Sequence, residues 1–390
     1  MRPCERLFVF LNDSAPRDRY RLVPVKLPRF DMERMQSQWE HRVRYDLSES
    51  GVEALTLEEI TRDQKELMRT RLGYAEGTGR EETRALVAGF HPGSEAANVV
   101  ITTGTSEANF IALATLVGAR DEVVVVMPNY MQLHGIAHGL GARVREVWLR
   151  EERGWTIDLD ALRAAVTERT KVICVCTPNN PTGQILSAGE IGAIVRIADA
   201  HGAWIIADEV YRGAERSGEE SPSFSGRGER IIVTGGLSKV YGLPGLRIGW
   251  IVAPRDRVEA ALEMKDYTTI APATLSEALA QIALERRKQL LERARFLLNE
   301  RWPLLEEWAS RRSRELHWTA PAAGAICFFS YQYPIDSQPF VDRLIRDYST
   351  MIVPGIQFRA ERHLRIGFGM QPRILTSGLA AIDRLLTSLD

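Results

Sequence analysis

The sequence predicts an α/β protein built on a mostly parallel sheet covered by helices, and three observations support that prediction. The chain has 390 residues, of which 45% are hydrophobic and 26% charged, which is ordinary for a globular protein of one large or two ordinary domains. Its middle part alternates apolar runs with amphipathic stretches, the pattern of repeated βα units. The apolar runs are continuous and rich in β-branched residues, which is typical of strands buried on both faces of a sheet.

The first two thirds of the chain supply the strands of this sheet and the helices between them. Seven strands are predicted, at 98–102, 122–127, 143–148, 171–176, 204–208, 230–234 and 247–252. Amphipathic helical stretches lie between them, among them 106–117, 159–166 and 188–200. We therefore expect a large domain at 46–272.

The pattern changes after about Ala271. A long helical segment is predicted at 274–299 and another at 302–314, with Pro303 at its start or at a kink. Strand-like segments then alternate with helices, the strands at 324–331, 351–353 and 363–368 and the helices at 336–348 and 374–386. We expect 273–390 to form a smaller α+β domain together with 1–45, an N-terminal arm with few clear elements.

Charge and cysteine usage exclude several classes of protein. Lys and Arg total 50 and Asp and Glu total 51, and this near-neutral balance argues against nucleic-acid binding. No apolar run approaches the roughly 20 residues of a membrane span, and no signal peptide is recognised, so a cytoplasmic protein is expected. The cysteines are too few and scattered for a disulfide framework or a metal site, which leaves buried free thiols at Cys4, Cys174, Cys176 and Cys327.

The most informative segment follows the predicted strand at 230–234. It reads Gly236-Leu-Ser-Lys-Val-Tyr-Gly-Leu-Pro-Gly-Leu-Arg-Ile-Gly249, so that Lys239 lies in a glycine-rich loop with Arg247 eight residues later. A lysine in such a loop can form a Schiff base with a carbonyl, and the arginine offers a planar fork that suits a phosphate. A small molecule with both a carbonyl and a phosphate is pyridoxal 5′-phosphate (PLP). The alternative is a tight turn with chance Lys and Arg residues.

This segment resembles the lysine-attachment pattern of the class I and II aminotransferases, the fold-type I PLP enzymes, and the resemblance covers about Tyr74 to Phe368. It implies a large domain with a seven-stranded, mostly parallel sheet, a smaller α+β domain and PLP as cofactor. Lys239 resembles the lysine that holds PLP as an aldimine and moves a proton between the substrate Cα and the cofactor. Asp208, after a predicted strand, resembles the family's partner of the pyridine nitrogen, although an Asp there is also a common helix cap.

The same resemblance assigns further cofactor contacts. Asn180, in an Asn-Pro-Thr-Gly turn, and Tyr211 would hydrogen-bond the phenolic oxygen of the ring, and Tyr130 would stack on it unless it is a core residue. A strand, turn and helix start at Gly104, Thr105 and Ser106 would bind the phosphate through backbone N–H groups, with Ser238 and Arg247. Tyr74 resembles a tyrosine that reaches the phosphate of the neighbouring subunit, which implies a homodimer with shared active sites.

For the substrate, Arg365 matches the family's arginine for the α-carboxylate, with Asn180 beside it, because a guanidinium fork reads a carboxylate in two bonds. Two departures stand out. Gly236 replaces a hydroxyl residue that often contacts the phosphate, and 46–52 replaces the usual glycine–x–proline turn. The second departure resembles the capreomycidine-synthase-like subset. It makes Glu49 and Gly51 substrate-binding candidates; Glu49 either faces a cationic side chain or caps a helix that starts near Leu57.

The resemblance implies an aminotransferase that passes the amino group of an L-α-amino acid to a 2-oxo acid, with Lys239, Asp208 and Tyr211 as catalytic residues. The alternative is a PLP enzyme of a natural-product pathway that eliminates, replaces or cyclises, as capreomycidine-synthase-like or aminocyclopropane-carboxylate-synthase-like enzymes do. A PLP-sensing regulator is disfavoured, because 1–45 is too short for a DNA-binding module and lacks its pattern. Trp39 and Tyr267 are candidates for an aromatic wall of the pocket or for the core.

Overall fold

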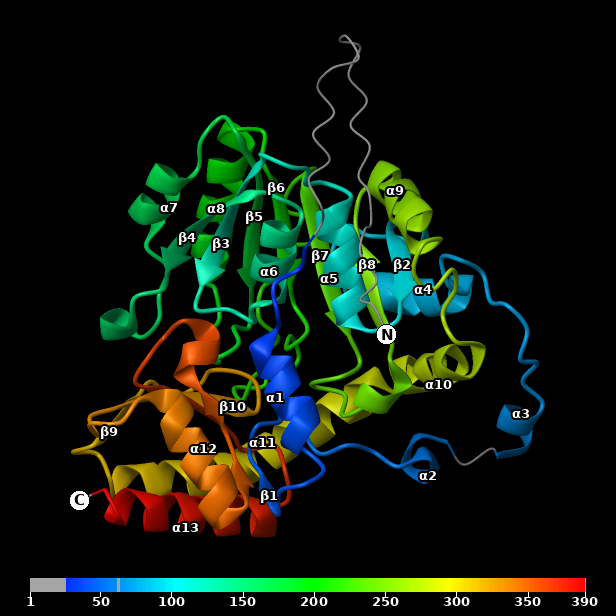
Figure 1. The fold of residues 1–390 in the computed structure, drawn as a ribbon. Helices are drawn as coiled ribbons and strands as arrows, with labels where there is room; N and C mark the ends of the chain where they lie inside the picture. The colour runs from blue at the N-terminus through cyan, green and yellow to red at the C-terminus, as the bar shows by residue number, and fades with distance from the viewer. Residues whose placement is uncertain (1–25, 62–63, 390) are drawn as a thin grey trace, which may run out of the picture.

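The larger of the two main sheets in the computed structural model contains the seven predicted strands (Figure 1). The structure describes residues 26–61 and 64–389; Cys4 and residues 1–25 of the predicted arm lie outside the described residues. The strand order is β2-β8-β7-β6-β5-β3-β4, and β8 alone runs antiparallel to its neighbours. The strands are β2 (Val99–Thr102), β3 (Glu122–Met127), β4 (Arg143–Trp148), β5 (Thr170–Cys176), β6 (Trp204–Asp208), β7 (Ile231–Gly236) and β8 (Gly249–Val252). The predicted mostly parallel α/β fold is confirmed.

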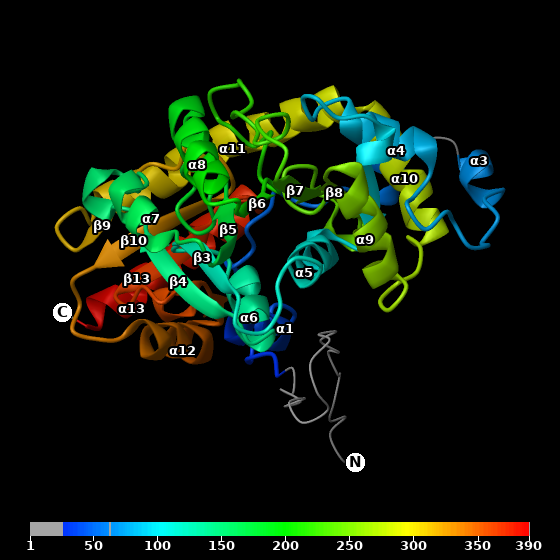
Figure 2. The ribbon, with the colours of Figure 1, turned by 90° about the horizontal axis from the view of Figure 1, so that it is seen from above.

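Alternate residues of these strands pack on opposite faces of the sheet. Val123 and Val125 of β3 join one apolar cluster, and Val124 and Val126 join the other. The first cluster lies under α5 (Thr105–Ala114), α6 (Gln132–Gly139) and α9 (Arg255–Lys265). The second lies under α4 (Glu81–Ala88), α7 (Leu159–Ala165) and α8 (Ala188–Ala200), and Figure 2 shows α8 and α5 on opposite sides of the strands. This double cover explains why the strand sequences are apolar throughout.

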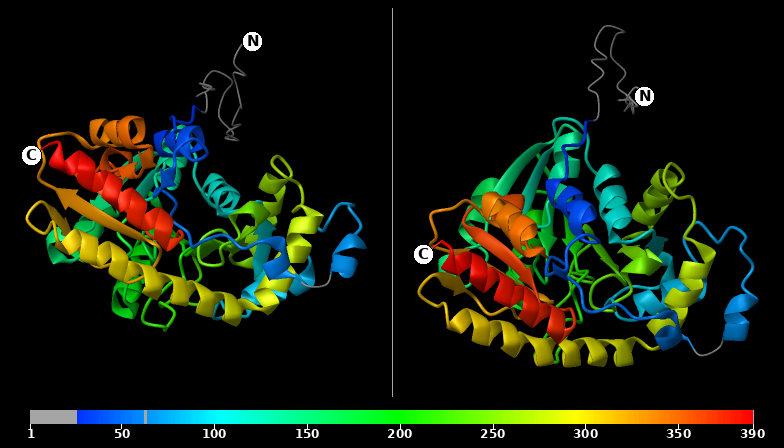
Figure 3. Two further views of the ribbon diagram at one scale, coloured as in Figure 1. Left: turned by 90° about the horizontal axis from the view of Figure 1, so that it is seen from below. Right: turned by 60° about the horizontal axis from the view of Figure 1, so that its bottom comes forward.

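The smaller sheet has four antiparallel strands in the order β12-β13-β10-β9. They are β9 (Leu316–Trp318), β10 (Ile326–Tyr331), β12 (Val353–Pro354) and β13 (His363–Gly367). The helices α12 (Ser337–Tyr348) and α13 (Pro372–Thr387) pack beside it, and α13 lies along α11 (Arg287–Ser310; Figure 3). A two-stranded parallel ladder joins β1 (Tyr45–Asp46) to β11 (Thr350–Met351), so the N-terminal part of the described chain is tied to this unit.

The structure corrects two predictions about helices. The predicted break near Pro303 is absent, because α11 runs unbroken through it (Arg287–Ser310), while α10 (Thr274–Glu285) ends just before Arg286. Pro303 is tolerated because it lies on the exposed side of α11, and Trp302 and Leu305 continue the buried side through it.

The second correction concerns the arm, which contains a helix, α1 (Asp31–Trp39), where few elements were predicted. Met32 and Met35 of α1 are buried, so packing rather than a strong local pattern stabilises it. Two short helices follow, α2 (Leu57–Ile60) and α3 (Gln64–Met68). Within the described residues, no helix is long and apolar enough to cross a membrane, and Cys174, Cys176 and Cys327 are buried free thiols.

Candidate active site

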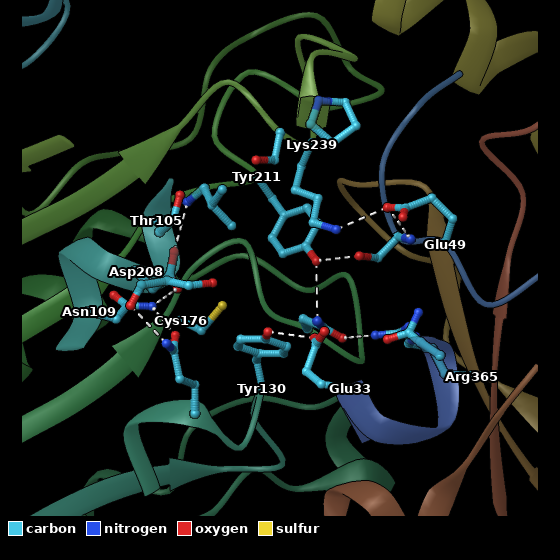
Figure 4. A pocket seen from close by; sticks show the side chains of 18 of the residues that line it. Glu33, Glu49, Thr105, Asn109, Tyr130, Cys176, Asp208, Tyr211, Lys239 and Arg365 are labelled. Atoms are coloured by element: carbon cyan, nitrogen blue, oxygen red, sulfur yellow. Dashed lines mark hydrogen bonds and ion pairs between the residues drawn. The ribbon is translucent and has the colours of Figure 1, made fainter. Parts of the chain in front are cut away.

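A cavity of about 270 Å³ lies where the ends of β5, β6 and β7 meet α1 and β13 (Figure 4). Most of the predicted site residues line it. They are Glu49, Thr105, Ser106, Tyr130, Asn180, Asp208, Tyr211, Ser238, Lys239, Arg247 and Arg365. The chain has six lysines. Among the described residues, Lys239 is the only lysine that lines this cavity.

Lys239 forms an ion pair with Glu49 across the cavity. Its Nζ donates to Glu49 Oε1 at 2.9 Å, and the same oxygen accepts hydrogen bonds from the backbone N–H groups of Ser50 (2.8 Å) and Gly51 (2.7 Å). Burial lowers the pKa of Lys239, but the Glu49 carboxylate outweighs this effect and the pKa is raised. The Lys239 ammonium in turn lowers the pKa of Glu49 to about 2.

Glu49 does not cap the helix near Leu57, so that alternative is wrong. Thr56 caps α2, because its side chain accepts from the N–H of Glu59 while the Glu59 carboxylate accepts from the N–H of Thr56. The Glu49 side chain is therefore available to the cavity.

Asp208 ends β6 and is held by a chain of hydrogen bonds. Asn109 Nδ2 donates to Asp208 Oδ2 at 2.8 Å, and Thr234 Oγ1 donates to Asn109 Oδ1 at 2.7 Å. The Val210 N–H donates to Asp208 Oδ1 at 3.1 Å. Asp208 is 5% exposed, and burial raises its pKa. Among the described residues no Lys, Arg or His forms an ion pair with it, so this buried carboxylate fits a ring nitrogen that carries a proton.

Tyr211, Asn180 and Arg365 form a connected network on another side of the cavity. Asn180 Nδ2 donates to the Tyr211 hydroxyl at 3.2 Å, and that hydroxyl donates to Ser50 Oγ at 2.9 Å. Arg365 donates from Nη1 to Asn180 Oδ1 at 2.9 Å and from Nη2 to the Ser48 carbonyl at 2.6 Å. Arg365 is 1% exposed, yet its Nε–H has no partner. A buried guanidinium with an unused donor fits a carboxylate.

The start of α5 provides a cradle for an anion. Gly104 precedes the helix with a φ of 78°, and a Cβ there would collide with the Arg247 guanidinium. Thr105 Oγ1 is buried without a partner. A Cβ on Gly236 would collide with this same oxygen, so the Thr105 hydroxyl occupies the space that a side chain at position 236 would fill. The helix start, the free hydroxyl and Arg247 together fit a phosphate.

Some predicted residues lie apart from this set. Gly51 and Gly104 do not line the cavity but lie next to residues that do: the Gly51 N–H donates to Glu49, and Gly104 precedes Thr105 at the start of α5. Tyr74 is 90% exposed and does not line the cavity, and its predicted contact with a neighbouring subunit stays a prediction. Neither candidate for an aromatic wall lines the cavity: Trp39 packs against the core and Tyr267 is 89% exposed.

Several residues that line the cavity were not predicted from the sequence. Glu33, Gln36 and Glu40 line the cavity from α1 and its end, and Asn109 supports Asp208. Glu33, Gln36 and Glu40 have the spacing i, i+3 and i+7 of one helix face. The sequence contains this pattern, but it was not used because the helix itself was not predicted.

Comparisons with known proteins agree with this geometry. Residues 45–382 match the family model described as aminotransferase class I and II. Capreomycidine synthase from Streptomyces vinaceus is 33% identical over 93% of this chain and 95% of that protein. A crystal structure titled as a PLP-dependent aminotransferase from Streptococcus suis 89-1591 superposes with a TM-score of 0.89, 31% identity and coverage of 94% and 99% of the two chains. The PLP-dependent cyclase OrfR superposes with a TM-score of 0.85, 27% identity and coverage of 97% and 100%.

Proposed function

The chain belongs to the aminotransferase class I and II family and is a PLP-dependent enzyme, and from that premise we propose that it transfers the amino group of an L-α-amino acid to a 2-oxo acid. The observation that supports this proposal is the convergence of three groups in one cavity. These are the amine of Lys239, the buried carboxylate of Asp208 and the unused Nε–H of Arg365.

The chain's own residues would hold PLP at three points. Thr105, Ser106, Ser238 and Arg247, with the start of α5 after Gly104, would bind the phosphate. Asp208 would keep a proton on the pyridine nitrogen, and Asn109 would keep Asp208 in place. The donors at the phenolic oxygen would be Tyr211 and Asn180, and Tyr130 would lie against the ring. When bound, PLP takes up the electron pair released at the substrate Cα.

Substrate orientation would depend on Arg365, and proton movement on Lys239. Arg365 would bind the α-carboxylate through Nε–H, while Asn180 and the Ser48 carbonyl hold its other nitrogens. With the carboxylate fixed, the Cα–H bond has one orientation in the cavity. Lys239 Nζ would then take the Cα proton, because in the part of the chain that the structure describes no other lysine lines the cavity.

A second candidate is a reaction that eliminates, replaces or closes a ring within the substrate. Two observations favour it. The relatives named above include a capreomycidine synthase and a PLP-dependent cyclase, both covered over nearly their whole lengths. Glu49 also places a charged carboxylate at 2.9 Å from Lys239 Nζ, which gives the cavity an additional negative group next to the amine. This reaction would use the same Lys239, Asp208 and Arg365.

One experiment separates the two candidates. The purified PLP-loaded protein is incubated with one amino acid at a time, without any oxo acid, and the extracted cofactor and products are quantified by chromatography. The panel includes arginine, hydroxyarginine and S-adenosylmethionine. Amino transfer is expected to convert up to one equivalent of cofactor to pyridoxamine 5′-phosphate with one equivalent of oxo acid. Many equivalents of an eliminated or cyclic product with unchanged PLP would instead establish the second candidate.

We also propose a cytoplasmic homodimer that binds neither nucleic acid nor membranes. Large apolar side chains are exposed on two segments that touch, since Thr274 Oγ1 donates to the Gly73 carbonyl and Lys265 Nζ to the Gly77 carbonyl. The exposed residues are Leu72, Tyr74, Tyr267, Ile270 and Leu275. A second copy of the chain would cover this patch and bring Tyr74 to the partner's phosphate site.

A further inference from the structure

We propose that Glu33 and Glu40, with Gln36 between them and Glu49 opposite, bind a cationic side chain of the substrate, a guanidinium or an ammonium. The inference rests on the proposed function, because it takes the cavity to be the site of an α-amino acid. It adds the chemical class of that amino acid and a set of residues that select it.

The geometry of α1 brings these side chains to the cavity. Residues three and four apart lie on one helix face, so Glu33, Gln36 and Glu40 share a face. The adjacent face carries Met32 and Met35, which are buried, and this packing fixes the rotation of the helix. Glu33 is further held by the Tyr130 hydroxyl, which donates to its Oε1 at 2.6 Å (Figure 4).

The charges of the cavity leave Glu33 without an ion pair among the described residues, although Glu33 and Glu49 lie close enough to Arg365 to raise its pKa against the larger effect of burial. The proposed function uses Arg247 for the phosphate, Arg365 for the α-carboxylate and Asp208 for the ring nitrogen. Lys239 pairs with Glu49 in this structure, but a lysine that holds PLP no longer offers Glu49 an ammonium. Among the described residues that line the cavity no other cation remains for Glu33 or Glu40. The contact of Glu40 with His41, at 3.3 Å, lies outside the cavity lining and is solvent-exposed.

Besides burial, the negative charges of the cavity raise the pKa of a nearby carboxyl group, that of Asp46. Asp46 has a raised pKa, first because it is buried and further because Glu49 and Glu40 are negatively charged. Like charges this close disfavour one another, and a bound cation would relieve that repulsion. A neutral side chain would instead cover the carboxylates without pairing them, which costs desolvation free energy.

A second, independent observation indicates that the cavity receives a ligand with both charges. The Arg365 Nε–H is buried without a partner and lies in the same cavity as Glu33. This N–H can be paired by a negative group, whereas the carboxylates of the α1 face can be paired by a positive one. An amino acid with a basic side chain has a carboxylate at one end and a cation at the other, so it satisfies both.

The test uses ligands that cannot react with PLP. Isothermal titration calorimetry of the PLP-loaded protein compares 5-guanidinopentanoate, 6-(dimethylamino)hexanoate and hexanoate, which share the carboxylate and differ at the far end. We expect at least one of the two cationic acids to bind about tenfold or more tightly than hexanoate, because charge-assisted hydrogen bonds add this much affinity. The stronger of the two cations identifies a guanidinium or an ammonium site. Equal affinities for all three acids would overturn the proposal.

Variants assign the preference to α1. Glu33→Gln and Glu40→Gln are each expected to reduce the preference for the cationic acid several-fold, and the double variant is expected to abolish it. Hexanoate binding should stay the same. Asp31→Asn is the matched control, since it removes the same charge from the same helix at a position that does not line the cavity. A preference that survives in the double variant, or that Asp31→Asn abolishes equally, would contradict the assignment.

The reaction with amino acids distinguishes a failure of the cationic subsite from a failure of the proposed function. If norleucine and arginine are consumed equally well, the enzyme function stands and the cationic subsite is wrong. If the guanidino acid binds with the expected preference but no amino acid is consumed, the subsite stands and the proposed reaction is wrong. The visible absorption of bound PLP confirms that each variant is folded and loaded.

Discussion

Single side chains in the cavity are held in charge states that suit a bound ligand. Glu49 stabilises Lys239 as an ammonium ion, while Asp208 is buried beside donors that are neutral. Burial raises the pKa of Asp208, and a cation bound beside it would favour its charged form. Arg365 keeps one N–H unused. The cavity therefore offers an amine, a carboxylate without a cation and a guanidinium with a free donor.

The first prediction at this scale concerns Lys239. Lys239→Ala is expected to abolish turnover and the visible absorption that depends on a covalent bond between Nζ and PLP, because no other lysine of the described chain lines the cavity. Absorption spectra and product formation check this result. Lys171→Ala is the control, since Lys171 is exposed on β5, and it should behave as the wild type. Full activity in Lys239→Ala would remove the basis of the assignment.

Arg365→Ala gives a second test at the residue scale. We expect PLP to stay bound and the KM for the amino acid to rise about tenfold or more, because the carboxylate loses a charged hydrogen bond. Steady-state kinetics with the consumed amino acid measure this change, and the cofactor spectrum serves as the control for loading. An unchanged KM would mean that another group holds the carboxylate.

At the scale of single elements, the ends of strands and helices determine where polar groups can be placed. β7 ends in Gly236, next to Thr105 at the start of α5 and just before Lys239. β3 begins with Glu122, whose carboxylate accepts from Arg169 Nη2 at 2.6 Å, Thr167 Oγ1 at 3.0 Å and Arg145 Nε at 3.1 Å. One end of the sheet thus holds the cavity, while the opposite end is stabilised by a network of charges.

Gly236→Ser tests the phosphate cradle. A serine hydroxyl is able to bind a phosphate, but the Cβ of a serine at this position would collide with Thr105 Oγ1, so we expect PLP binding to weaken about tenfold. Thr105→Ala should partly restore the affinity of the serine variant, because it removes the colliding atom. Fluorescence titration with PLP measures both. Gly245→Ser is the control, since a Cβ at Gly245 meets no other atom within 4 Å. Tighter PLP binding by Gly236→Ser would contradict this explanation.

Glu122→Gln is expected to lower the free energy of unfolding by about 2 kcal/mol at pH 7, because it leaves three donors without their carboxylate. Burial raises the pKa of Glu122, but Thr167 and Arg145 lower it by more, so its pKa lies below the ordinary 4.5. The stabilisation by the charged form is therefore present above about pH 4.5 and is lost as the pH falls through the lower folded-state pKa.

Urea unfolding at several pH values checks this prediction. The difference between the wild type and Glu122→Gln should be constant above pH 4.5 and shrink below it. Glu307→Gln removes an exposed pair with Arg311 and should change stability by about 0.5 kcal/mol or less. A difference that grows on acidification would show that Glu122 stabilises the fold in another way.

At the scale of the whole molecule, the cavity exists only because distant parts of the chain meet. Asp208 ends a strand of the larger sheet and Lys239 follows another, whereas Arg365 lies in the smaller sheet and Glu33 in α1 between the two sheets (Figure 1). The β1–β11 ladder keeps the segment before Glu49 in place. The division into domains at 46–272 and at 1–45 with 273–390 remains a prediction, as does the dimer.

The dimer is testable in solution. Sedimentation is expected to give twice the chain mass of 43.9 kDa. Replacing Tyr267 and Ile270 by Asp should produce monomers that also lose PLP more readily, because the predicted contact of Tyr74 with the partner's phosphate site disappears. Phe296→Asp changes an apolar residue that is 66% exposed on α11 and should leave the mass unchanged. A monomeric wild-type protein would contradict the prediction.

The sequence by itself determined the features that depend on neighbouring residues. The strands of the larger sheet were predicted within a few residues because burial on both faces makes them apolar throughout, and Lys239, Asp208 and Asn180 were recognised from the residues around them. Only the tertiary structure decided which carboxylates face the cavity. Glu33 and Glu49 lie there because Met32 and Met35 pack α1 onto the core and Lys239 binds Glu49. Asn109 reaches Asp208 because α5 packs on the sheet. Such contacts join residues far apart in the chain, and no local pattern specifies them.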